Sequence, residues 1–92
     1  METEKIQTMH PDPTKSNKKI LLIKYETIKT TLLSILQVSE LTHTDLMEKI
    51  YQEVKDTFEG GVQWYGEVVK LDLEARGIIE RTKTKPVLYR LK

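Results

Sequence analysis

The sequence predicts a mainly α domain of the α+β class, with three helices followed by a two-stranded β-hairpin. Apolar residues recur at helical spacing in three successive segments. Gly77 then follows Arg76 at the expected end of the third helix, where glycine tolerates a positive φ and a cation favours the last carbonyl groups. Two β-branched and apolar runs flank the basic turn at residues 83–86, which indicates the hairpin.

The N-terminal part of the chain has the least regular pattern. Residues 5–9 favour a short strand, and the prolines and polar residues after them are typical of a loop. We therefore expect an N-terminal extension at residues 1–22, with a short strand and a loop, ahead of a helical domain at residues 23–92.

The first two helices follow from apolar stripes and a capping signal. Steps of three and four predict a helix from about Ile23 to Gln37; the stripe comprises Tyr25, Ile28, Leu32 and Leu36. Thr42, with Asp45 three residues later, predicts the N-cap of the second helix. The inward face of that helix is expected to carry Leu46, Ile50, Val54 and Phe58. The pair Gly60-Gly61 is expected to end it.

The third helix, from about Val62 to Arg76, is expected to be mainly a packing element. Its apolar stripes cover about half of the circumference and comprise Trp64, Val68, Leu71 and Ala75, together with Tyr65, Val69 and Leu73. We therefore expect Trp64 and Tyr65 in the core; the alternative is an exposed aromatic platform for a base or a peptide. The remaining polar arc comprises Gln63, Gly66, Glu67, Lys70 and Glu74.

Asp72 and Arg76 lie within the apolar arc of this helix at an i,i+4 spacing, where their side chains can pair. The pair fits a structural ion pair at a packing seam or a dimer interface, and a catalytic carboxylate with a tuning cation is the weaker alternative.

Charge is unevenly distributed along the 92 residues, although the net charge is only +1. Residues 1–24 sum to +2, residues 25–77 to −5 and residues 78–92 to +4. An acidic helical body is thus flanked by two basic ends, which bears on any choice of partner. The chain has no cysteine, so that disulfides and thiolate metal sites are excluded.

The sequence gives no pattern for a membrane segment or a catalytic centre. Its longest apolar run, residues 20–23, is far shorter than the roughly 20 residues of a membrane span, and its first residues lack the layout of a signal peptide. We therefore expect a cytoplasmic protein without a membrane partner. His10 and His43 show no metal-ligand or acid–base spacing, and Gly60-Gly61 lacks a phosphate-loop pattern, so we expect neither an enzyme nor a cofactor or metal.

The order of three helices and a C-terminal hairpin resembles the winged helix-turn-helix group throughout residues 24–92, which is most of the chain. The segment LEARGIIER at residues 73–81 is similar to the turn from third helix to wing in many bacterial regulators. Further motifs resemble a small uncharacterised family of single-domain bacterial winged-helix proteins: Gly60-Gly61, Trp64-Tyr65, Leu71-Asp72-Leu73-Glu74 and Lys85-Pro86. The resemblance implies a three-helix core with a C-terminal β-hairpin wing, and implies no established activity.

The winged-helix resemblance leads to a hypothesis of DNA binding. In such regulators the third helix usually enters the major groove and the wing contacts the backbone. On the polar arc only Gln63 and Lys70 suit base contact, because its two glutamates would approach phosphates of their own sign. The cations expected to contact phosphates are Arg81, Lys83, Lys85 and Arg90. Neutralising about three phosphates gives weak, salt-sensitive binding; a solvated strand edge is the alternative role of these cations.

The leading hypothesis is therefore a DNA-associated or transcription-regulator-like protein with weak contacts to duplex DNA through a basic wing. The alternative is a protein-interaction module on the same scaffold, with the acidic helical face as its contact surface. Either a monomer or a homodimer is compatible with the sequence.

Overall fold

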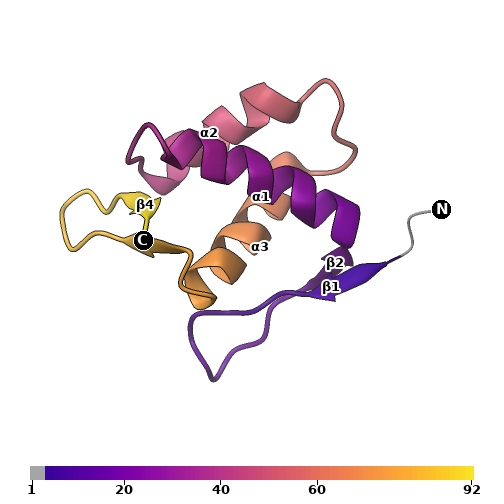
Figure 1. Ribbon diagram of the computed structural model, residues 1–92, viewed down its shortest axis with the longest axis horizontal. Helices are drawn as coiled ribbons and strands as arrows, with labels where there is room; N and C mark the ends of the chain where they lie inside the picture. Colours follow the sequence, from indigo (N-terminus) through magenta and orange to yellow (C-terminus); the bar gives the residue numbers. More distant parts are fainter. Residues whose placement is uncertain (1–3) are drawn as a thin grey trace.

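The computed structural model describes residues 4–92, so that the first three residues of the expected extension lie outside it. Three helices and two antiparallel hairpins form one unit (Figure 1). The elements are β1 (Lys5–Gln7), β2 (Lys19–Leu21), α1 (Leu22–Leu36), α2 (His43–Val54), α3 (Val62–Ala75), β3 (Ile79–Arg81) and β4 (Tyr89–Leu91). The expected mainly α, α+β class is thus observed. None of the helices in residues 4–92 combines the length and apolar character needed to span a membrane.

The helices pack around one apolar core. The stripe expected on α1 is buried, and α2 contributes the buried side chains of Leu46, Met47, Ile50 and Val54. Thr42 caps α2 as predicted, because its Oγ1 accepts a hydrogen bond from the backbone N–H of Asp45 at 3.2 Å. The helix ends at Val54, earlier than expected, and Phe58 packs against the core from the following turn.

The orientation of α3 differs from the expected one. Gly66 is buried against α2, and a Cβ atom there would lie 2.7 Å from the Sδ of Met47. The close approach of α2 places Val62, Gly66, Val69 and Leu73 on the buried side of the helix. The expectation that Trp64 lies in the core is therefore wrong, since Trp64 is 47% exposed. Tyr65 is only partly buried.

The two hairpins lie toward opposite ends of the long axis (Figure 1). In the first, β1 confirms the predicted short strand, and it pairs with β2, a strand that was not predicted. In the second, β3 pairs with β4. On its other side β4 is held by Leu41, which exchanges two backbone hydrogen bonds of 3.2 and 2.7 Å with Tyr89. The C-terminal hairpin is thereby fixed to the turn between α1 and α2.

Gly77 ends α3 with a φ of +75°, and a Cβ atom there would meet no other atom within 4 Å. Replacing it tests the backbone conformation alone. We expect Gly77→Ala to lower the free energy of unfolding by about 1 kcal/mol, because an L residue is strained in this region. The control is Gly61→Ala at a φ of −77°, which we expect to change stability by less than about 0.5 kcal/mol. Urea unfolding of both variants measures this, and equal stabilities would contradict the assignment.

Candidate functional site

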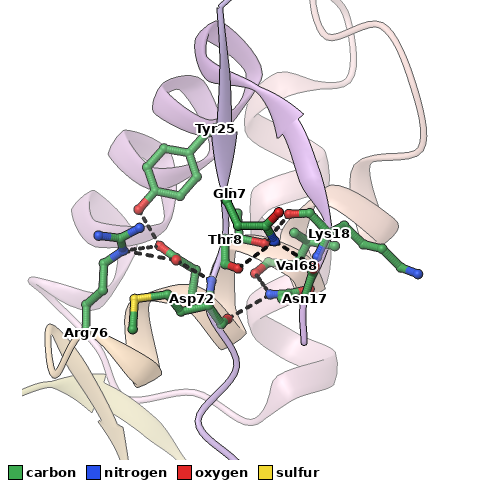
Figure 2. Close-up of polar contacts among 9 residues, drawn as sticks. Gln7, Thr8, Asn17, Lys18, Tyr25, Val68, Asp72 and Arg76 are labelled. Atoms are coloured by element: carbon green, nitrogen blue, oxygen red, sulfur yellow. Dashed lines mark hydrogen bonds and ion pairs between the residues drawn. The ribbon is translucent and has the colours of Figure 1, made fainter. Parts of the chain in front are cut away.

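The carboxylate of Asp72 joins three parts of the chain beneath the surface (Figure 2). Its side chain is fully buried on α3. One oxygen accepts a hydrogen bond from the Tyr25 hydroxyl on α1, and both oxygens accept from Arg76 Nε at 2.8 and 3.0 Å. The backbone N–H of Met9, in the loop after β1, donates to Asp72 Oδ1 at 2.8 Å. The predicted Asp72–Arg76 pair is confirmed, within a larger network than its spacing indicates.

This network is structural in character. Burial and the hydrogen bond to Asp72 raise the pKa of Tyr25 above its ordinary value, so that the phenol remains a donor at neutral pH. All three donors point to a carboxylate that has no solvent-exposed surface, which leaves it no contact with a substrate. A buried charge is stable only with such partners. Through its hydrogen bonds with Met9 and Tyr25, Asp72 therefore holds the N-terminal loop and α1 against α3.

A second set of hydrogen bonds fixes the far side of the same loop (Figure 2). Asn17 Nδ2 donates to the backbone carbonyls of Met9 and of Val68 on α3, at 2.9 and 3.0 Å. Gln7 Nε2 donates to the carbonyl of Asn17 at 2.9 Å, and the Thr8 hydroxyl donates to that of Lys18. The loop between β1 and β2 is thus attached to α3 at both Met9 and Asn17.

A cleft of about 260 Å³ lies between this loop and α3. Its lining includes His10, Asn17 and Lys18 from the loop and Trp64, Glu67 and Leu71 from the helix. Half of the Trp64 side chain faces solvent here, and its ring contacts Tyr65 edge-on with centroids 4.9 Å apart. The sequence indicates the aromatic platform only as an alternative to core packing, and no local pattern predicts the cleft, because its two walls are 46 or more residues apart in the chain.

The six residues proposed for DNA contact do not form one free basic surface. Arg81 is held by Glu74 at 2.8 Å, and Arg90 by Glu80 at 2.8 Å and by Glu40 at 3.9 Å. The remaining exposed members are Gln63, Lys83 and Lys85. Within residues 4–92 no carboxylate pairs with Lys83 or Lys85.

Lys70, expected on the polar arc, is instead buried, with only 5% of its surface exposed. Its Nζ lies 4.0 Å from the centroid of the Tyr89 ring, so that its aliphatic stem is covered while the charge is held by the aromatic face. His43 lies close enough for the charge of Lys70 to affect it. Burial chiefly, with help from Lys70, lowers the pKa of His43, whereas Glu67 opposes this shift. The side of α3 that carries Lys70 thus faces the protein interior.

The fold and the site define a small α+β domain whose N-terminal loop is attached to α3 by hydrogen bonds. The chain belongs to the family of unknown function DUF6958, whose model matches residues 5–89. No curated protein and no solved structure matches the chain. The matched span includes both strands of the first hairpin and all of α3, so that the family model covers the Asp72 network and the cleft.

The Asp72 network predicts a graded loss of stability. We expect Asp72→Ala to lower the free energy of unfolding by about 3–5 kcal/mol, because it leaves Arg76, the buried Tyr25 hydroxyl and the Met9 amide without this acceptor. Tyr25→Phe removes one donor and leaves the rest, so we expect a loss of about 2 kcal/mol. Asp56→Ala, at an exposed site after α2, should stay within about 0.5 kcal/mol of the parent.

Urea unfolding followed by circular dichroism measures these three variants. Hydrogen exchange adds a local readout, since the Met9 amide should exchange faster in Tyr25→Phe once the Asp72 network loosens. A Tyr25→Phe variant as stable as the parent would show that the bond from Tyr25 contributes nothing to stability, and an Asp72→Ala variant as stable as the parent would show the same of the whole network.

Proposed function

We propose that this protein is a protein-interaction module on a winged-helix scaffold, and that its contact surface is the cleft between α3 and the N-terminal loop. The order of three helices and a C-terminal hairpin supports the scaffold. The pairing of Leu41 with Tyr89 supports it further, because it joins the hairpin to the helical core.

The exposure of Trp64 carries this proposal. Tryptophan offers the largest apolar surface of any side chain, and a half-exposed one on a helix that is otherwise mostly buried costs hydrophobic stabilisation. Tryptophan is also the residue most enriched at the centres of protein interfaces, where polar groups surround an apolar anchor. The cleft has this composition: Trp64 and Leu71 provide apolar surface, and His10, Lys18 and Glu67 surround it.

Trp64 is the sole tryptophan of the chain, so that its fluorescence reports on the cleft directly. We expect a random dodecapeptide library without tryptophan to yield peptides that shift the Trp64 emission to shorter wavelength. Calorimetry should show that Trp64→Ala weakens their binding by about 30-fold, the effect of a typical hot-spot residue. Tyr51→Ala, which removes an aromatic ring of similar exposure on α2, should leave binding unchanged. Peptides that bind Trp64→Ala as tightly as the parent would refute the proposal.

A second candidate function rests on the C-terminal hairpin. Lys83 and Lys85 are exposed at its turn, and in the part of the chain that the structure describes no carboxylate pairs with them. Two free ammonium groups suit weak contact with the backbone of duplex DNA, whereas the exposed Glu67 on α3 disfavours base contact. This candidate has less support, because the two arginines of the hairpin already have carboxylate partners.

Fluorescence anisotropy with a labelled random duplex at low salt tests the DNA candidate. We expect a dissociation constant of about 10⁻⁴ M that rises steeply with salt, and its loss in the double variant Lys83→Glu/Lys85→Glu. The double variant Lys49→Glu/Lys55→Glu makes the same charge change at exposed positions on and after α2, and should bind nearly as the parent does. Equal loss in both double variants would attribute binding to net charge alone.

A further inference from the structure

Trp64 differs from most other aromatic side chains of the protein in that no lysine or arginine of residues 4–92 lies over its ring. Four of the six aromatic rings have a lysine ammonium 4.0–5.8 Å from the centroid; they are Tyr25, Phe58, Tyr65 and Tyr89. Within residues 4–92 Trp64 and Tyr51 have none. The indole ring is the strongest partner for a cation among these side chains. In the cleft, the ring of Trp64 is therefore available for a cation–π contact of the kind that other rings of the protein make with its own lysines.

A carboxylate lies beside this ring. Glu67 follows Trp64 by three positions on α3 and lines the same cleft. Its side chain is exposed, and no lysine, arginine or histidine of residues 4–92 forms an ion pair with it. An aromatic face next to a free carboxylate is the arrangement that binds an ammonium or guanidinium group.

Among residues 4–92, Lys18 is the lysine or arginine that lines the cleft, on the opposite wall. The charge of Lys18 repels other cations from its own wall. A cationic group that enters the cleft is therefore favoured at the opposite wall, against Trp64 and Glu67. The helical body beyond the cleft is acidic, because residues 25–77 carry a net charge of −5. A basic partner is therefore attracted to the helical body as a whole, of which the Trp64 and Glu67 wall is a part.

We propose that the cleft binds one lysine or arginine side chain from an extended segment of a partner protein, with the cationic head between the Trp64 ring and the Glu67 carboxylate. This inference rests on the proposed function. The volume of about 260 Å³ accommodates one such side chain with adjoining backbone, and the half-buried Leu71 contacts the aliphatic stem.

Four nonapeptides test the inference. They share a Gly/Ser/Leu background without aromatic residues and differ only in the central residue, which is Lys, Arg, norleucine or Glu. Titration followed by Trp64 fluorescence should show Lys and Arg binding about three- to tenfold more tightly than norleucine, and Glu more weakly. Glu67→Gln should remove the preference for Lys and Arg, and Lys18→Gln should increase their affinity. Glu53→Gln, an exposed carboxylate on α2, is the matched control and should change nothing.

The outcomes separate this inference from the proposed function. Equal affinity for the Lys and norleucine peptides would overturn the cationic side chain, and an undiminished preference for Lys in Glu67→Gln would overturn its placement beside the Glu67 carboxylate. The proposed function would still stand if library-selected peptides bind through Trp64. If no peptide of either series alters Trp64 emission, both are overturned. Circular dichroism of each variant confirms that the fold is intact.

Discussion

The burial of the Asp72 carboxylate is the constraint on which the rest of the structure depends. An ionised carboxylate inside a small core requires donors from its surroundings, and the nearest residues on α3 supply only Arg76. The other donors come from Tyr25 on α1 and from the backbone of Met9. The N-terminal loop must therefore dock on α3 for the charge to be satisfied. One wall of the cleft exists because of this docking.

The other wall depends on how α3 is turned about its axis. Gly66 has no Cβ atom, which allows α2 to approach this side of α3 closely. The side that carries Gly66 and Val69 becomes the buried one, and Lys70 is covered by the ring of Tyr89. The same rotation moves Trp64 toward solvent, beside the docked loop. The close packing of α2 against Gly66 thus accounts for the exposure of Trp64 to solvent.

Local signals in the sequence predicted the elements well, and tertiary contacts account for what was missed. Helical spacing, the Thr42 cap and the positive φ of Gly77 each act within a few residues of chain, as does the Asp72–Arg76 pair. The contacts of Asp72 with Tyr25 and Met9 span 47 and 63 residues, and no local pattern indicates them. Trp64 was wrongly predicted to be buried because hydropathy assigns Gly66 and Lys70 to the polar face of the helix. Gly66 is buried because it has no Cβ atom, and Lys70 is buried because the ring of Tyr89 covers it. The strand β2 was missed because its three residues run directly into α1.

Tertiary contacts also determine which charged side chains are paired and which remain available to a partner. The last fifteen residues carry a net charge of +4 in the sequence, yet Glu40 and Glu74, on separate parts of the helical body, approach the arginines of the hairpin. The exposed pair of Arg90 with Glu40 contributes little stability, but both pairings lower the positive potential that a polyanion would meet. Unlike Glu40 and Glu74, Glu67 faces solvent and has no ion-pair partner in the described chain. The charge that disfavours contact between α3 and phosphates is therefore available to a cationic group of a protein, and the ring of Trp64 lies beside it in the same cleft.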